Sequence, residues 1–304
     1  MKKAMQKTMT KIAVAAAASL AINAAIASES DDPYIWLEDV DGKKALDWVK
    51  SQNDLSLGEL TALPEFKRLY EKNLEVYQSD KRIPYVTERG DYLYNFWQDK
   101  THVRGIYRRT TMAEYKKAAP KWETVIDFDA LAKAENENWV YKGMTCLKPK
   151  QNLCLLQLSR GGADATVIRE FDLSTQTFVD GGFYLPEQKS SVSWIDEDHL
   201  YVGTKVRSDD LTDSGYPRVT YLWKRGQDIK DAQIIYAGDK SSVGIWSGRT
   251  MVGSDHIDTI TDALTFFTNK TFIRHNDMLV AIKKPNSADY SGYFKGNVFI
   301  TLKK

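Results

Sequence analysis

The stretch LSRGGADATVIREFDL, Leu158 to Leu173, decides between two folds for this chain. As a hairpin it joins two strands, and Gly161 and Gly162 accept the positive φ angles that a tight connection needs. As a hydrolase elbow it would present Ser159 as a nucleophile, which requires G-x-S-x-G between a strand and a helix. That pattern occurs nowhere in the 304 residues, and the stretch continues as a strand rather than a helix. The sequence therefore predicts a β-turn here and no catalytic role for Ser159.

The strand pattern extends on both sides of this hairpin, over residues 82–304. Segments rich in Tyr, Val, Ile, Trp and Thr alternate with Gly, Asp and Asn turns, and they form groups of four that each span about 45 to 60 residues, close to the period of propeller blades. The groups are IPYVTE, YLYNFWQ, GIYRRTT and ETVIDFD; WVYKGMT, NLCLLQLS, TVIREFDL and TFVDGGFYL; VSWIDED, LYVGTKV, RVTYLWKR and AQIIYAG; and VGIWSGRTMV, LTFFTNK, MLVAIKK and NVFITLKK. We predict a mainly β fold, an incomplete β-propeller of about four four-stranded blades.

Residues 28–81 precede the strands and carry helical spacing. Leu46, Val49 and Asn53 share one helical face, and apolar residues recur at three- and four-residue steps after Pro64. We therefore expect a short α-helical segment before the propeller.

The first 27 residues have the pattern of an export signal. Lys2, Lys3, Lys7 and Lys11 form a basic region, an alanine-rich apolar run follows, and Ala25-Ile26-Ala27 fits the small-x-small cleavage pattern. The run is about 16 residues, shorter than the roughly 20 that a membrane span needs. We expect cleavage after Ala27 and a periplasmic or secreted protein with no membrane anchor.

The charge of the mature chain bears on its partners. Removing residues 1–27 takes away four lysines and no acidic residue, so the formal charge falls from +1 to −3. A mildly acidic chain argues against nucleic acid as a partner.

Cys146 and Cys154 lie on either side of an expected turn through Lys148 to Asn152. Paired strands would place them opposite each other, and an oxidising compartment permits a disulfide. The alternative is a pair of small buried thiols. Neither interpretation gives the cysteines a catalytic role.

The remaining candidate residues favour structural roles. His102, His199, His256 and His275 are scattered, and a metal site from His256 and His275 is the weaker interpretation. Asp209, Asp210 and Asp213 lack the ligand ladder of a calcium loop, and Asp196, Glu197 and Asp198 fit a strand turn better than a pair of catalytic acids. We expect no metal and no cofactor.

Two further clusters have a plain and a functional interpretation. Arg104, Arg108, Arg109, Lys116 and Lys117 would suit an anion, but in strands Arg108 and the lysines are most simply a solvent-facing row. Trp36 and Trp48 would suit a ligand groove, but aromatic residues on short helices usually pack.

Several blocks of this sequence resemble the amino-terminal region of the prolyl oligopeptidase family of serine peptidases. The blocks are DPYIWLED at 32–39, WVKSQN at 48–53, NFWQDKTHVRGIYRRTT at 95–111, WETVIDFDALA, WVYKGMTCLKPKQNLCLLQLSRGGADATVIREFD, and GYPRVTYLWKRG at 215–226. They cover residues 32 to about 300 in the order that the family uses.

The resemblance implies more than this chain contains. Family members have a helical segment, a seven-bladed propeller that acts as a size filter, and an α/β-hydrolase domain that carries a Ser-Asp-His triad and cleaves short peptides. It also implies that Trp36 and Trp48 lie against the hydrolase domain. Since this chain ends near the fourth blade, no catalytic residue carries over.

We therefore expect a chain that is truncated before the catalytic domain, resembles a serine-type endopeptidase and is inactive alone. The alternative is a non-catalytic propeller module that binds peptide or complements a separate catalytic chain. An unrelated enzyme that uses propeller carboxylates is a third, weaker interpretation.

Overall fold

The computed structural model describes residues 32–303, so the export signal expected at 1–27 lies outside the described residues. The chain divides into two compact units, Met1–Glu75 and Val76–Lys304. The boundary falls within a helix.

The first unit is helical where it is described. It contains η2 (Ile35–Glu38), α2 (Lys43–Thr61) and most of α3 (Pro64–Gln78), whose first residue is a proline, as suits the first turn of a helix. Trp36 packs edge-on against Trp48, with ring centroids 6.2 Å apart, and the Lys44 Nζ lies 4.1 Å from the centre of the Trp36 ring. No helix in the described range is long and apolar enough to cross a membrane.

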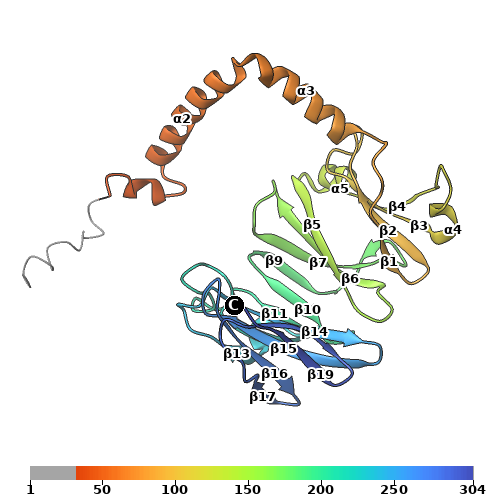
Figure 1. The fold of residues 1–304 in the computed structure, drawn as a ribbon, viewed down its shortest axis with the longest axis vertical. Helices are drawn as coiled ribbons and strands as arrows, with labels where there is room; N and C mark the ends of the chain where they lie inside the picture. Colours follow the sequence, from red (N-terminus) through yellow and green to blue (C-terminus); the bar gives the residue numbers. More distant parts are fainter. Residues whose placement is uncertain (1–31, 304) are drawn as a thin grey trace, which may run out of the picture. The chain divides into compact units, whose positions relative to one another are not determined.

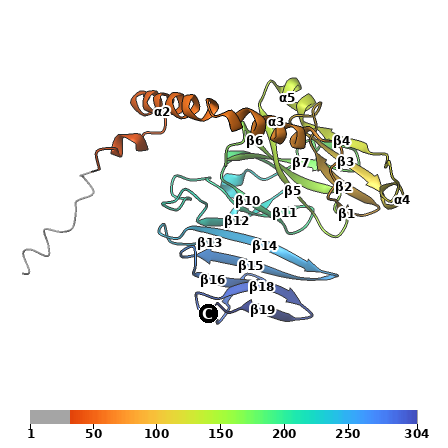
Figure 2. The same cartoon turned by 45° about the horizontal axis from the view of Figure 1, so that its top comes forward.

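The second unit is built of antiparallel sheets that follow one another along the chain (Figures 1 and 2). We call the first four sheets blades 1 to 4. Blade 1 is β1 (Thr87–Arg89), β2 (Tyr92–Trp97), β3 (Ile106–Thr111) and β4 (Glu123–Asp127). Blade 2 is β5 (Trp139–Cys146), β6 (Leu153–Arg160), β7 (Thr166–Asp172), β8 (Thr177–Phe178) and β9 (Tyr184–Gln188). Blade 3 is β10 (Ser191–Trp194), β11 (His199–Gly203), β12 (Val219–Lys224) and β13 (Gln233–Ala237). Blade 4 is β14 (Gly244–Val252), β15 (Asp255–Ala263), β16 (Asn269–His275) and β17 (Met278–Ala281). A two-stranded sheet follows, β18 (Asp289–Phe294) and β19 (Asn297–Thr301), and the short helices α4 (Met112–Tyr115), α5 (Phe128–Glu135) and η3 (Ile229–Asp231) lie between strands.

The first strands of successive sheets lie against one another. β10 contacts both β5 and β14, and β14 contacts β18. Such contacts are expected when the first strand of each blade lines the inside of a propeller. We call β5, β10, β14 and β18 the inner strands. The prediction of a mainly β, propeller-type fold is confirmed.

The predicted strand groups are correct for blades 1 and 3 and need correction elsewhere. The last segment of the second group divides into β8 and β9, and β9 pairs with β7. In the fourth group β15 was not predicted, and the strand predicted at 264–270 is mostly the connection to β16. The final segment, β19, pairs with β18 outside blade 4.

The core lies between the blades, and β6 shows why. Along this strand Cys154, Leu156 and Leu158 pack toward blade 1, whereas Leu155 packs toward blade 3, and all four are fully buried. A strand buried on both faces must be apolar at consecutive positions, which accounts for the run LCLLQL. Each of these leucines contributes about 1.5 to 3 kcal/mol to folding.

The opening stretch is a hairpin, as predicted. β6 and β7 pair through Leu158 and Val167, and the connection contains Gly161 at φ 65° and Gly162 at φ 95°. Ser159 is fully buried and donates a hydrogen bond to the Ala163 carbonyl oxygen at 2.8 Å. The hydroxyl therefore closes the turn.

Candidate functional site

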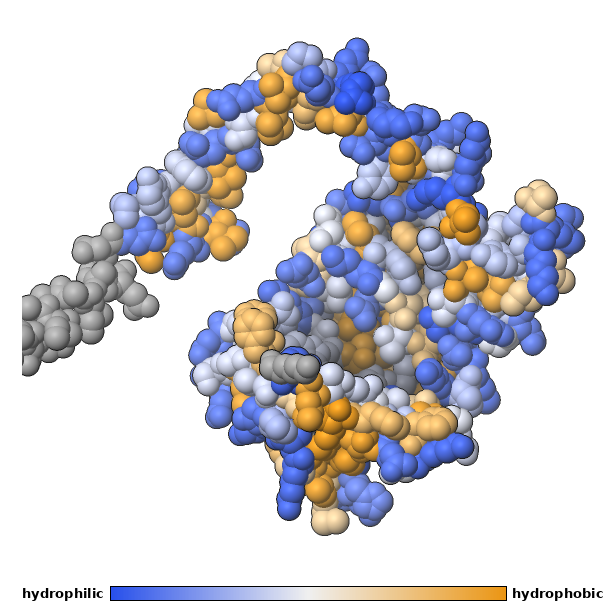
Figure 3. Space-filling view, in the orientation of Figure 1, coloured by the Kyte–Doolittle hydropathy of each residue, from blue (hydrophilic) through white to orange (hydrophobic). Residues whose placement is uncertain are grey.

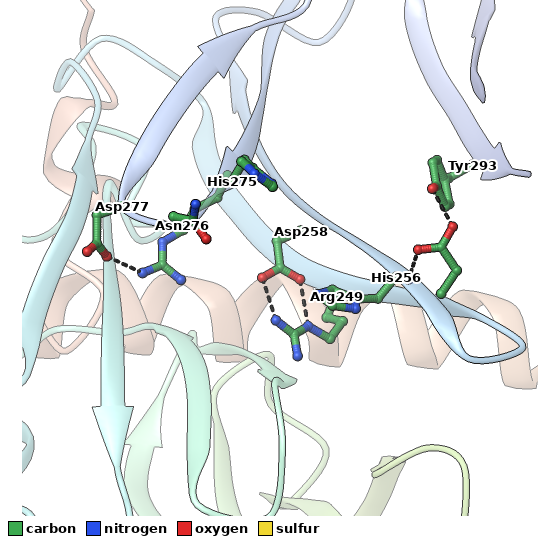
Figure 4. A pocket seen from close by; sticks show the side chains of 9 residues that line it. Arg249, His256, Asp258, His275, Asn276, Asp277 and Tyr293 are labelled. Atoms are coloured by element: carbon green, nitrogen blue, oxygen red, sulfur yellow. Dashed lines mark hydrogen bonds and ion pairs between the residues drawn. The ribbon is translucent and has the colours of Figure 1, made fainter. Parts of the chain in front are cut away.

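A cavity of about 700 Å³, which we call the blade 4 cavity, is formed by strands of blade 4 together with β18 (Figure 4). Its wall is almost entirely polar. The lining residues are Arg249, Asp255, His256, Asp258, Arg274, His275, Asn276, Asp277 and Tyr293.

Strand register places three charged side chains in one row on this wall. Arg249 on β14 lies opposite Asp258 on β15, and Asp258 lies opposite Arg274 on β16. Residues directly opposite in antiparallel strands point to the same face, so the charges alternate across the blade. The Arg249 Nε and Nη2 donate to the two Asp258 oxygens at 2.7 and 2.8 Å.

The row is anchored to blade 3. The Tyr201 hydroxyl donates to Asp258 Oδ2 at 2.8 Å, the Arg274 Nη1 donates to the Tyr201 oxygen at 3.0 Å, and the Arg249 Nη1 donates to the Ile195 carbonyl at 2.9 Å. Burial, followed by the neighbouring Asp258, raises the pKa of Tyr201 to about 12. The hydrogen bond to Asp258 raises the pKa of Arg249. At neutral pH the Tyr201 phenol therefore stays neutral and the Arg249 guanidinium stays charged, so the wall is suited to binding and to joining blades rather than to moving protons.

Two of the four histidines lie beside aspartates. The His102 Nδ1 lies 3.0 Å from Asp99, and the His199 Nδ1 lies 2.9 Å from Asp196. A triad would need a serine hydroxyl hydrogen-bonded to the other ring nitrogen. Within residues 32–303, the only hydroxyl that bonds to either ring is that of Thr101, and it bonds to the same Nδ1 of His102.

His256 and His275, the pair considered for a metal, do line the same cavity. No cluster of three or more His, Cys, Asp or Glu side chains suited to a metal ion occurs among the described residues.

The two acidic stretches have structural contacts. Asp210 is buried and accepts hydrogen bonds from the backbone of Val206 and Arg207 and from the Tyr221 hydroxyl. Asp209 pairs with Arg218 and Lys240. The loop around Asp213 is therefore held by a buried carboxylate, an anchor that its polar sequence does not reveal.

Asp196 caps its turn by accepting a hydrogen bond from the Asp198 backbone. Burial raises its pKa, but the hydrogen bonds that follow, led by that of His199, lower it more, so the net pKa is below the usual value. Neither Glu197 nor Asp198 completes a pair of catalytic acids with Asp196: Glu197 pairs with Lys150, and Asp198 lies near Arg225.

The interpretation of Arg108 as a solvent-facing residue is wrong. Its guanidinium lies 4.1 Å from the ring centre of Trp97 and 4.2 Å from that of Trp122, so it stacks between two aromatic rings. Burial lowers its pKa to about 10. Arg109 pairs with Glu123, and Lys117 pairs with Glu114. The cluster does not converge on an anion site.

Cys146 and Cys154 form a disulfide in the structure, at directly opposite positions of β5 and β6. Cys146 also lines a cavity of about 210 Å³ that β5, β10 and β14 share. The loop 147–152 that the disulfide closes contributes to this cavity and to its neighbour.

The residues that build the blade 4 cavity were not predicted as site residues from the sequence, apart from His256 and His275. Arg249, Asp258 and Arg274 lie on strands that look half solvated, because their charges alternate with apolar residues. Only the register of β15 brings these charges together, and β15 was missed.

The inner strands and interblade cores define a β-propeller domain. The family model described as prolyl oligopeptidase, N-terminal beta-propeller domain, matches residues 16–274. The chain belongs to this family.

Known relatives are much longer than the matched region. An uncharacterized peptidase of Sinorhizobium fredii is 39% identical over 282 residues, which covers 90% of this chain and 39% of the relative. A prolyl endopeptidase of Elizabethkingia miricola is 25% identical over 221 residues, 70% of this chain and 29% of the relative. The chain thus spans about two fifths or less of these relatives.

The solved structures agree on the fold. The structure of a post-proline cleaving enzyme from Rickettsia typhi matches with a TM-score of 0.80 and 30% identity, covering 87% of this chain and 40% of that one. Oligopeptidase B from Leishmania major, at 14% identity, shares the fold with a TM-score of 0.64 over 88% of this chain and 37% of its own.

Proposed function

We propose that this chain supplies the propeller part of a prolyl-oligopeptidase-like serine peptidase and cleaves no peptide by itself. Peptide hydrolysis by this mechanism needs a serine that a histidine base activates. The observation that carries the proposal is the match to the propeller of peptidases, including the post-proline cleaving enzyme, over most of this chain. A catalytic α/β-hydrolase domain, on the same or a separate polypeptide, would complete the enzyme.

A peptidase assay tests this proposal. The purified 304-residue chain should release no chromophore from a Gly-Pro reporter. Joined to the catalytic part of the Sinorhizobium fredii relative, it should give activity that a serine-directed inhibitor removes, and the same fusion with the catalytic serine changed to alanine serves as the control. Inhibitor-sensitive cleavage by the chain alone would overturn the proposal, as would an inactive fusion that is folded.

We also propose that the protein acts outside the cytoplasm. The basic and alanine-rich first 27 residues support export, and the paired cysteines fit an oxidising compartment. Intact mass measurement on protein from a periplasmic fraction should give a chain that begins at Ser28. Full-length protein confined to the cytosol would contradict export.

A further inference from the structure

A second cavity, of about 330 Å³, lies among blades 2, 3 and 4, away from the row formed by Arg249, Asp258 and Arg274. Residues of the inner strands β5, β10 and β14 line it, together with Asp164 of the connection between β6 and β7. The side chains that matter here are Lys142, Asp164, Lys189, Ser191, Tyr216 and Trp246. The volume is at the lower end of the range of small-molecule sites.

The charged groups of this cavity are not paired with one another or with neighbours. Within residues 32–303, Lys142, Lys189 and Asp164 take part in no ion pair, whereas Arg249 and Arg225 elsewhere in the propeller are paired with buried carboxylates. Lys142 donates only to the Gly162 carbonyl oxygen, at 3.2 Å. Two ammonium groups against one carboxylate leave the cavity with a net positive charge, which favours an anionic ligand.

An aromatic wall stands beside these charges. The ring centroids of Tyr216 and Trp246 lie 6.2 Å apart, and the Lys189 Nζ lies 4.9 Å from the Tyr216 ring centre. Both rings remain exposed, at 37% for Tyr216 and 41% for Trp246. Exposed aromatic rings that meet in a polar cavity provide a surface on which a ligand ring can stack.

The backbone is shaped to hold this wall. A Cβ at Gly244 would lie 2.9 Å from the Trp246 ring and 3.0 Å from the Tyr216 Cβ. Only glycine at this position therefore leaves room for both side chains where they lie. Ser191 also lines the cavity, and its buried Oγ has no hydrogen-bond partner among the described residues. The cavity thus holds two ammonium groups outside any ion pair and an aromatic pair set close to Gly244.

We propose that this cavity binds a carboxylate that carries a ring, with Lys142 and Lys189 contacting the carboxylate and Trp246 and Tyr216 contacting the ring. A carboxylate beside a ring is the chemistry of an aromatic C-terminal residue of a short peptide and equally of a free aromatic acid. The peptide is the source we assign, and that assignment rests on the proposed function. The carboxylate site itself rests on the cavity alone.

Calorimetric titration of the full chain tests the proposal, with tryptophan fluorescence as a second signal. The probes are Gly-Gly-Phe, its C-terminal amide and N-acetylphenylalanine. We expect the free-acid tripeptide to bind at least tenfold more tightly than the amide. Lys189→Gln should weaken the acid about tenfold and leave the amide unchanged, and Trp246→Ala should weaken both.

Lys205→Gln is the matched control, since Lys205 is an exposed lysine outside this cavity. Circular dichroism establishes that each variant is folded. Equal affinities for acid and amide, equal effects of the Lys189 and Lys205 substitutions, or no saturation by the folded chain at millimolar peptide would each overturn the site. N-acetylphenylalanine that binds as tightly as the tripeptide would overturn the peptide assignment. The Gly-Pro assay of the fusion is independent of these titrations, so failure of the proposed function is separately visible.

Discussion

Glu170 is an acidic side chain that the fold places almost out of reach of water, with 1% of it exposed. The Arg225 Nη1 and Nη2 donate to its two oxygens at 2.8 and 2.9 Å, and the Phe183 backbone donates at 2.8 Å. This pair joins blade 2 to blade 3. We expect Glu170→Gln to lower the free energy of unfolding by about 3 kcal/mol, because Arg225 is left partly buried without its charge partner. Urea denaturation measures the change.

The matched control is Glu123→Gln, which removes the partner of Arg109 on blade 1. The Glu123 side chain is 51% exposed, so solvent screens the pair and the loss should stay below about 1 kcal/mol. Equal losses in the two variants would contradict the role assigned to Glu170.

Tyr201 and Tyr221 give the protein a pH dependence in the alkaline range. Burial first, and then a nearby carboxylate, raises the pKa of each phenol to about 12. An unfolded tyrosine has a pKa of about 10, so their contribution to stability is complete below pH 10 and is lost as the pH rises from 10 to 12. Urea denaturation across this window should give a falling free energy of unfolding.

In the double variant Tyr201→Phe and Tyr221→Phe, the free energy of unfolding should fall less steeply over the same window. Tyr85 is 89% exposed, and Tyr85→Phe should leave the slope unchanged. An unaltered slope in the double variant would show that these phenols do not control alkaline unfolding.

Among the secondary-structure elements, β5 and β6 are joined by a disulfide, whose contribution to stability is the clearest one to predict. The disulfide joins cysteines that are eight positions apart in the sequence, and constraining the unfolded chain over so short a loop is worth about 2 to 3 kcal/mol. Changing both Cys146 and Cys154 to serine should therefore lower the free energy of unfolding by that amount. Dithiothreitol should destabilise the wild type and leave the variant unaffected, and a wild type that resists full reduction without losing stability would argue against the prediction.

The same elements show how far sequence reasoning reaches. The strands of blades 1 and 3 were predictable because apolar positions alternate between clear turns, and the hairpin at Gly161 was predictable because only its glycines take positive φ freely. β15 was not predictable in this way. Its Asp258 and Asp262 suggest a solvated segment, yet both are buried. Arg249 pairs with Asp258, and the Tyr236 hydroxyl donates a hydrogen bond to Asp262 Oδ2.

The opposite kind of wrong prediction was made for the connection between β15 and β16. Phe266 and Phe267 suggested a buried strand there, but their side chains are 87% and 76% exposed. Burial between blades is decided by partners far away in the sequence, so a local pattern cannot distinguish a paired acid from a solvated one, or an exposed phenylalanine from a core one. The two cavities depend on the same long-range pairing, which is why their walls were missed.

The described chain exposes apolar surface around β16, β17 and β19 (Figure 3). The exposed apolar residues of β17 to β19 and the residue that follows, which we call the C-terminal apolar patch, are Met278, Val280, Phe294, Phe299 and Leu302, and Phe266 and Phe267 are exposed separately in the connection to β16. Exposed apolar side chains favour association, and the unpaired edges of β17 and β19 in the described chain add hydrogen-bonding groups. We expect the purified 304-residue chain to self-associate as its concentration rises.

Phe294 and Phe299 are the residues through which to test this. Phe299 lies opposite Gly292, two residues before Phe294, so both rings point to one face of the β18–β19 hairpin, and each is 51% exposed. Phe294→Ser with Phe299→Ser should shift the chain toward monomer in light scattering after size exclusion. Val103→Ser, at an exposed apolar position of blade 1, should leave the association constant unchanged. A wild type that stays monomeric at every concentration would show that these side chains are tolerated in water, and the patch would then no longer support a role in association.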